Sequence, residues 1–178
     1  QRYYHAVVDF LNNRLGLEIS PEKSKVTNLK KNSSDFLGFK IKAVPQGKSK
    51  YGYVAKTDMC EKALKKSKAN LRQKILEIQN HTNAEEVKKY NSAVTGIQNY
   101  YRIATNVYNN LTEVDYALLR TRNNRLRKKA KIVRFGETPS DFKKKTTGIR
   151  DCKKIYRIMD IHMLPITGVH HKSPMNFS

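Results

Sequence analysis

The stretch from Ala84 to Asn106 constrains the fold most, because its apolar residues recur at alternating steps of three and four. This spacing places them on one face of a helix. The stripe comprises Val87, Tyr90, Val94, Ile97, Tyr101 and Ala104. Thr82 and Glu85 stand three residues apart and predict a capping box before this helix. A helix with so long an apolar face needs other helices to cover it.

Two more helices are predicted, one on each side of the first. The earlier one begins near Asp58, with Glu61 completing a capping box. Its stripe comprises Cys60, Leu64, Ser67, Leu71, Ile75 and Ile78. The later one is capped by Thr112 and ends in a basic segment, Arg120 to Arg134. Three such stripes can close the core of a small helical bundle.

The flanking segments are less regular. Tyr3 to Leu15 has helical spacing and ends at Gly16. Residues 36–43 alternate as a strand does, and residues 51–55 form the expected return strand of a hairpin. Beyond residue 134 the pattern weakens. Residues 135–178 are predicted to be a loosely structured basic extension, in which a short helix is expected near Ser140 and residues 155–165 are apolar enough to pack against the rest.

Charge indicates the kind of partner. The chain has 36 Lys and Arg against 15 Asp and Glu, a formal net charge of +21, which favours a polyanion over the alternative of a merely soluble basic protein. No run of about 18 apolar residues is present, so no membrane span is expected. Cys60 and Cys152 lie far apart, which indicates reduced thiols in a cytosol-like compartment.

Two basic segments are the candidate nucleic-acid contacts. Residues 120–134 carry eight positive side chains and no negative one, and a phosphate backbone would relieve their repulsion. A solvated helix face is the alternative. The candidates in this segment are Arg120, Arg122, Asn123, Arg125, Arg127, Lys128, Lys129 and Lys131. The candidates on the helix that begins near Asp58 are Lys65, Lys66, Lys68, Arg72 and Lys74.

The end of the central helix offers further candidates. Tyr101 lies on the apolar stripe and is expected in the core, whereas Tyr100 lies off it and could stack on a base beside Arg102. Gly96 is unfavourable inside a helix by about 1 kcal/mol, which indicates close approach of another helix or of RNA.

No catalytic centre is visible in the residues. Cys152, His162, His170 and His171 match no zinc spacing, so no metal site is predicted. Paired catalytic carboxylates and a hydrolytic triad are also lacking. From the residues alone, we interpret the chain as a nucleic-acid-binding piece of a longer protein, without a complete active site.

Several segments resemble, in the right order, the group II intron reverse transcriptases, which also act as maturases. Two segments of the chain resemble the last palm motifs of that family, namely LNNRLGLEISPEKSKVTNL and, after it, DFLGFKI. Its maturase-specific domain resembles GIQNYYRIA and RNNRLRKKAK, although Ile97 and Gln98 replace the family's common Trp and its neighbour. The tail PITGVHHKSPMN resembles the segment before DNA-binding or endonuclease regions in some members.

The resemblance implies an α+β chain, predominantly α. Residues 1–56 would be the end of a polymerase palm with a β-hairpin, and residues 57–134 a three-helix thumb or maturase X domain. Residues 135–178 would be a basic extension that leads to a possible DNA-binding or endonuclease region. The implied partners are the template–primer duplex and the intron RNA, and target DNA is a further one.

The family polymerises DNA on an RNA template with two Mg²⁺ ions held by palm aspartates, including a YADD-type motif. That motif is expected upstream of Gln1, so this piece is not expected to polymerise alone. Lys23 matches a family lysine near the incoming nucleotide's phosphates, with Lys25 as runner-up and a plain surface lysine as the alternative. Phe36 to Phe39 resembles the region that supports the primer end, where Gly38 is expected to allow close backbone approach.

Two other functions stay open at this point. The chain could be a stand-alone RNA-binding splicing factor without polymerase activity, or it could be a DNA-targeting domain. A YADD-type motif upstream would favour the polymerase, and Cys and His clusters downstream would favour DNA cleavage. The expected location is the bacterial cytoplasm, with an organelle as the alternative.

Overall fold

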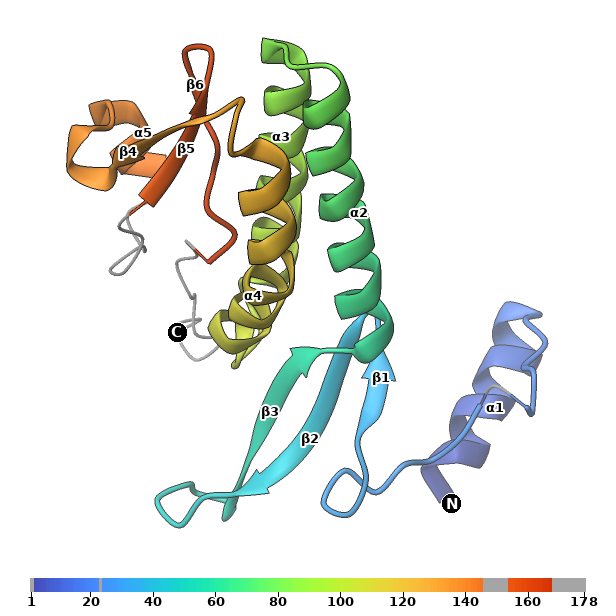
Figure 1. The fold of residues 1–178 in the computed structure, drawn as a ribbon. Coiled ribbons are helices and arrows are strands. Elements are labelled where there is room, and N and C mark those ends of the chain that lie inside the picture. The colour runs from blue at the N-terminus through green and yellow to red at the C-terminus, as the bar shows by residue number, and fades with distance from the viewer. Residues whose placement is uncertain (1, 23, 146–153, 168–178) are drawn as a thin grey trace. The chain divides into compact units, whose positions relative to one another are not determined.

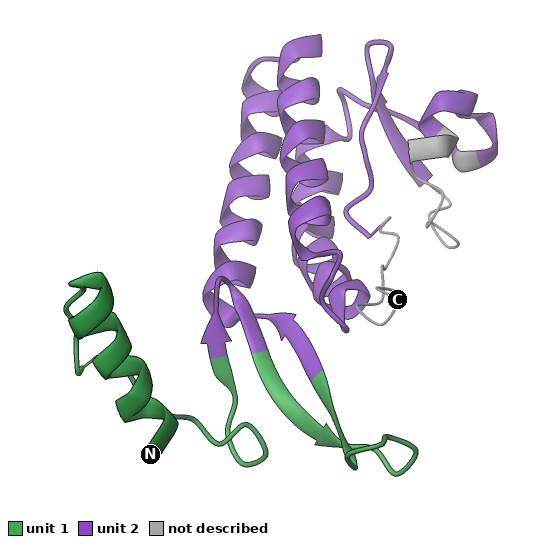
Figure 2. Ribbon diagram, turned by 180° about the vertical axis from the view of Figure 1, so that it is seen from behind, with its two compact units in different colours: residues 1–34, 41–55 green, residues 35–40, 56–178 purple. Residues whose placement is uncertain are grey.

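The computed structural model describes residues 2–22, 24–145 and 154–167 of a mixed α+β chain with two small sheets, which confirms the predicted fold class (Figure 1). The chain divides into two compact units (Figure 2). Unit 1 comprises residues 1–34 and 41–55, and unit 2 comprises residues 35–40 and 56–178. The assignment of residue ranges to a palm, a thumb and an extension stays a prediction.

Unit 1 begins with the predicted N-terminal helix, α1 (Arg2–Leu15). Gly16 follows with a φ of 62°, the left-handed conformation that commonly ends a helix. None of the residues of α1 is buried. Later in the unit, the backbone N–H of Gln46 donates to the carbonyl of Gly52 at 3.0 Å and closes a hairpin tip.

The first sheet has the strand order β1-β2-β3, formed by β1 (Ser34–Phe36), β2 (Phe39–Pro45) and β3 (Tyr53–Met59). The predicted hairpin is therefore confirmed, but the prediction of one strand over residues 36–43 is wrong. Leu37 and Gly38 break it, with φ angles of 47° and 82°. Two successive residues with positive φ are typical of the tight turn that joins two-residue hairpins, and here they join β1 to β2.

The bundle of unit 2 contains α2 (Glu61–Asn80), α3 (Ala84–Tyr101) and α4 (Val107–Leu126) (Figure 1). The predicted stripes are confirmed, because they supply most of the core. The fully buried residues of the three helices include Leu71, Ile75, Ile78, Val87, Tyr90, Leu111, Val114 and Leu126. No helix among the described residues is long and apolar enough to span a bilayer.

The predicted caps of α2 and α3 are wrong. Asp58 lies in β3, where its carboxylate accepts a hydrogen bond from the side chain of Asn106 at 2.8 Å. The N-cap of α3 is Asn83, whose side-chain oxygen accepts from the backbone N–H of Glu86 at 2.9 Å. Thr82 instead donates back into the end of α2. Asn83 is the N-cap because its side chain, unlike that of Thr82, satisfies a free N–H at the start of α3.

Both predicted ends of the third helix are also wrong. It begins at Val107, so Thr112 lies inside it and donates to the carbonyl of Tyr108 at 2.8 Å. A hydroxyl that bonds to its own helix in this way is not a cap. At the other end the helix stops at Leu126, because residues 131–134 pair with a later strand instead of continuing the helix.

The extension of unit 2 is more ordered than expected. The strands β4 (Lys131–Arg134), β5 (Lys154–Ile158) and β6 (Ile161–His162) form an antiparallel sheet in this order, with Ile132 opposite Tyr156. A 3-10 turn (Phe135–Glu137) and the expected short helix, α5 (Ser140–Lys145), lie between β4 and β5. The prediction of a loosely structured extension is wrong for these residues.

The extension packs against the bundle, as its apolar content predicted. Ile158, Met163 and Ile166 are buried in the same core as the helices. Two amide side chains of α3 add polar contacts. Asn91 donates to the carbonyl of His162 and accepts from the N–H of Leu164, and Gln98 donates to the carbonyls of Pro165 and Ile166. These contacts satisfy backbone groups in β6 and in the segment that follows it.

Candidate nucleic-acid interface

The Leu37–Gly38 turn is fixed to the end of α3 and the start of α2. The backbone N–H of Cys60 donates to the carbonyl of Gly38 at 2.8 Å, and the hydroxyl of Tyr100 donates to the carbonyl of Leu37 at 2.8 Å. A Cβ on Gly38 would lie 2.8 Å from the hydroxyl oxygen of Tyr101. In this structure the close approach that Gly38 permits is therefore to the chain's own Tyr101.

Three aromatic rings support the turn. Phe39 stacks on Tyr100 with ring centres 5.6 Å apart and meets Tyr101 at 5.2 Å. Tyr101 is partly buried against the core, as predicted, and burial raises the pKa of its hydroxyl. Tyr100 stays about half exposed, so it remains available to a partner on its outer side. Because two contacts hold its ring, Tyr100 presents a fixed surface.

A groove of about 620 Å³ opens beside these rings, between the turn, α2 and α3. Its lining combines apolar, aromatic and basic side chains. The lining residues include Phe36, Leu37, Lys62, Lys66, Asn70, Gly96, Ile97 and Tyr100. A groove lined by both apolar and basic side chains suits a ligand that has apolar surface as well as negative charge.

Gly96 explains part of the opening. Apart from the two neighbouring residues and the nearby backbone of α3 itself, no described atom lies within 4 Å of the position that a Cβ at Gly96 would take. Close approach of another helix, one of the two explanations predicted for this glycine, is therefore wrong within the described structure. The missing side chain instead leaves open space at the wall of the groove.

The basic side of the groove is one row on α2. Lys62, Lys66 and Asn70 are four residues apart and all exposed, so they lie along the helix about one turn apart. Among the described residues, no ion pair involves Lys62 or Lys66. These two ammonium groups can therefore serve an external anion without breaking an internal contact.

The other predicted basic residues of α2 are engaged. Arg72 lies 3.3 Å from the hydroxyl of Thr121. The ion pairs of α2 are Lys65 with Glu61 at 2.8 Å, Lys68 with Glu113 at 2.6 Å and Lys74 with Glu77 at 2.7 Å. The hydrogen bond from Lys65 lowers the pKa of Glu61, as expected for a carboxylate beside an ammonium group. Each pair offsets a positive charge locally.

Arg122 is the predicted contact that the structure places furthest from the surface. Its side chain is buried and donates to the carboxylate of Asp115 at 2.7 Å, and its guanidinium lies 5.3 Å from the ring centre of Tyr156. It therefore joins α4 to the extension, and it is not brought to the interface.

Some of the remaining candidates on and after α4 make hydrogen bonds within the chain, and others do not. Arg125 donates to the side chain of Gln79, Lys129 donates to the carbonyl of Gln79, and Asn123 accepts from the hydroxyl of Tyr156. The exposed candidates with no such contact among the described residues are Arg102, Arg120, Arg127, Lys128 and Lys131. Lys25 is exposed in unit 1, and Lys23 lies outside the described residues.

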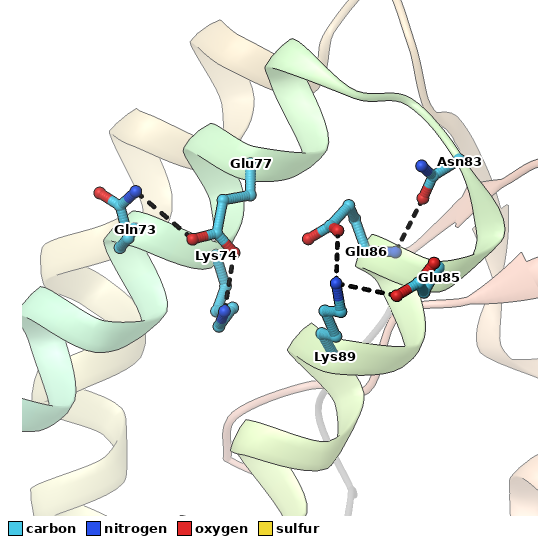
Figure 3. A network of polar contacts seen from close by, with 7 residues as sticks. All are labelled: Gln73, Lys74, Glu77, Asn83, Glu85, Glu86 and Lys89. Atoms are coloured by element: carbon cyan, nitrogen blue, oxygen red, sulfur yellow. Dashed lines mark hydrogen bonds and ion pairs between the residues drawn. The ribbon is translucent and has the colours of Figure 1, made fainter.

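The opposite end of the α2–α3 pair holds a cluster of carboxylates (Figure 3). Lys89 pairs with Glu85 and Glu86, each at 2.9 Å, near the Asn83 cap. Hydrogen bonding from Lys89 lowers the pKa of Glu85, and the two carboxylates raise the pKa of Lys89. We call this the turn end, and the end with the Leu37–Gly38 turn the groove end.

No metal cluster is found in the described part of the chain, where no group of three or more His, Cys, Asp or Glu side chains converges. His162 lies in β6, and burial lowers the pKa of its imidazole. Cys152, His170 and His171 lie outside the described residues.

Comparison with known proteins leaves the family open. No protein-family model matches the chain, and no curated protein matches it. The interface is therefore defined by its geometry.

Sequence reasoning missed part of the groove. Lys62 and Asn70 line it but were not among the predicted site residues. The spacing of four between Lys62, Lys66 and Asn70 was a visible signal. Phe36 and Leu37 were indicated only by the resemblance of residues 36–39 to the primer-end region, because an apolar pair in a strand by itself normally indicates core packing.

Proposed function

We propose that the chain is the C-terminal part of a group II intron reverse transcriptase and maturase, and that unit 2 binds the template–primer duplex and the intron RNA. The ordered resemblance of several segments supports the family. The groove end supports the binding role, because it is the place where unpaired basic groups, an aromatic ring and open space coincide.

The row of Lys62 and Lys66 carries this proposal. Two ammonium groups about one helical turn apart, with no internal carboxylate partner among the described residues, form a short track of positive charge along α2. A phosphate backbone neutralises such a track and releases its bound cations, which drives association. Duplex RNA is recognised mainly through its backbone and shape, which suits a helix that presents a row of positive charge.

The neighbouring groups would complete the contact. Tyr100 is held by Phe39 and by the Leu37 carbonyl, so its exposed side is in a defined position for a sugar or a base edge. Gly96 removes the side chain that would otherwise narrow the same wall. Asn70, at the end of the lysine row, offers both a donor and an acceptor.

Polymerisation, in this proposal, belongs to the parent protein. Its Mg²⁺ ions would be held by palm aspartates outside this chain. Lys23 would contribute phosphate contact only in the intact enzyme. We assign binding to this chain and no chemical step to its residues.

The test is a salt-dependent binding series on the 178-residue chain, with structured group II intron RNA and an unrelated duplex RNA of equal length. We expect the intron RNA to bind more tightly. The Lys62→Ala/Lys66→Ala variant should weaken both complexes and lower the slope of log K against log salt by roughly 2, since each lysine lost removes about one phosphate contact.

The matched control is Lys74→Ala/Lys89→Ala, which removes the same charge at the turn end. This control should bind nearly as the unmodified chain does, because its lysines are paired with Glu77, Glu85 and Glu86. Equal losses in the two variants would show that only net charge matters. Equal affinity of the unmodified chain for both RNAs would overturn maturase-type specificity.

A further inference from the structure

The outward face of α4 carries an aromatic and basic stripe that the groove does not use. Tyr116 is 80% exposed, and Thr112 and Arg120 lie four residues before and after it on the same helix. Residues four apart on a helix are neighbours on one face. None of the residues that line the groove belongs to α4.

The orientation of α4 is set by its opposite side. Leu111, Val114, Leu118 and Leu126 are almost completely buried, and they follow the helical repeat along the side that packs into the bundle. Tyr116 lies half a turn from this buried side. Its exposure is therefore fixed by the packing of the helix and does not depend on its own rotamer.

The carboxylates near the stripe are paired with cations of the chain. The two carboxylates of α4 are occupied, Glu113 by Lys68 at 2.6 Å and Asp115 by Arg122 at 2.7 Å. From Tyr116 to the end of the helix the sequence contains no Asp or Glu. An anion that approaches Tyr116 therefore meets Arg120, and just beyond the helix Arg127, while the exposed carboxylate of Glu113, three residues before Tyr116, is paired with Lys68.

We propose that the α4 stripe, centred on Tyr116 and Arg120, binds an unpaired stretch of RNA by stacking a base on the tyrosine ring and pairing a phosphate with the arginine. The proposal rests on the proposed function for RNA as the partner and adds a second surface for a different RNA form. Base stacking on an aromatic ring needs an exposed face, which duplex RNA does not offer inside the helix.

Tyr116 suits this role better than the tyrosine at the groove. Tyr100 has one ring face on Phe39 and its hydroxyl bonded to the Leu37 carbonyl. For Tyr116, no ring contact or hydrogen bond is found among the described residues. An unpaired base can therefore reach its ring without displacing another side chain.

A single-tryptophan reporter tests the stacking directly. The chain contains no Trp, so Tyr116→Trp places the sole indole on the stripe. Tyr3→Trp is the matched control, because Tyr3 is 87% exposed on α1. We expect a short oligouridylate to quench the fluorescence of the Tyr116→Trp chain saturably, and Arg120→Ala to raise the midpoint of that titration several-fold. Absence of quenching, or equal quenching of both reporters, would overturn the proposal.

Affinity measurements separate this surface from the groove. Tyr116→Ala should weaken oligouridylate binding by about 5- to 100-fold, while Tyr116→Phe, which keeps the ring, should bind as the unmodified chain does. Both should bind duplex RNA normally. A loss in Tyr116→Phe equal to that in Tyr116→Ala, or an equal loss for duplex RNA, contradicts stacking.

The two proposals can fail independently. If Lys62→Ala/Lys66→Ala leaves duplex binding intact, the groove proposal fails. The Tyr116 variants still decide whether unpaired RNA stacks on α4, because they change no charge and lie outside the groove.

Discussion

The two ends of the α2–α3 pair are built from the same residue types but treat them differently. At the turn end, Lys74 and Lys89 each meet a glutamate of the chain (Figure 3). At the groove end, Lys62 and Lys66 meet none among the described residues. The difference teaches that a basic composition does not locate an interface by itself, because what matters is which cations the fold has left without a carboxylate.

The largest change in stability is expected at Arg122, the buried arginine that is paired with Asp115. Arg122→Ala should lower the free energy of unfolding by about 3–5 kcal/mol, because it leaves the partly buried carboxylate of Asp115 without its partner. Denaturant unfolding measures this loss. Folded Arg122→Ala protein should bind duplex RNA normally.

Arg120→Ala is the control for this prediction, because its side chain is exposed two positions away on the same helix. It should leave stability within about 0.5 kcal/mol. If Arg120→Ala destabilises the chain as much as Arg122→Ala, the contrast between arginines that are paired with a carboxylate and those that are not is wrong.

Arg122 also shows where sequence reasoning stops short. Its position continues the apolar stripe of Leu111, Val114 and Leu118 at steps of three and four, so its burial could have been predicted. The basic run around it favoured a surface role instead. Its ring partner, Tyr156, lies far along the chain in β5, and no local pattern indicates that contact.

The helices and their buried faces were predictable, because apolar periodicity is a local property and one face must be covered. The caps were not, because Thr82 and Asn83 are adjacent and both residue types are good caps. Pairing of lysines was partly predictable. Lys74–Glu77 is visible as a helical spacing of three, whereas Lys68–Glu113 joins two helices and depends on how they pack.

The next largest effect is at the turn end. Asn83→Ala removes the acceptor for the backbone N–H of Glu86 and should lower the free energy of unfolding by about 1 kcal/mol. Asn83→Asp keeps the acceptor and should be close to the unmodified chain. Thermal unfolding measures both. A change in RNA affinity in folded Asn83→Ala protein would show that the turn end takes part in binding, contrary to the comparison.

At the groove end, Gly96→Ala should change the free energy of unfolding in the opposite direction. It should raise the free energy of unfolding by about 0.5–1 kcal/mol, because alanine is the better helix former and no described atom obstructs its Cβ. The same methyl enters the groove, so duplex RNA should bind slightly less tightly. Higher stability with unchanged affinity would show that RNA does not approach Gly96.

The smallest effect is a pH dependence at the turn end. Hydrogen bonding from Lys74, and to a lesser degree from Gln73, lowers the pKa of Glu77. A carboxylate with a lowered pKa adds stability above its unfolded-state pKa, near 4.3, and loses that contribution as the pH falls through its folded-state pKa. At neutral pH, Glu77→Gln should therefore cost about 0.3 kcal/mol, typical of helical ion pairs.

The cost of Glu77→Gln should disappear on acidification below the folded-state pKa, because the native carboxyl is then neutral as well. Denaturant unfolding of both chains at neutral and acidic pH measures the difference. In a Lys74→Met background the cost should be small at every pH, since the favourable partner is absent. If the cost of Glu77→Gln still depends on pH in the Lys74→Met background, the effect belongs to other groups. Lys74 would then not be neutralised by Glu77 in the way proposed here.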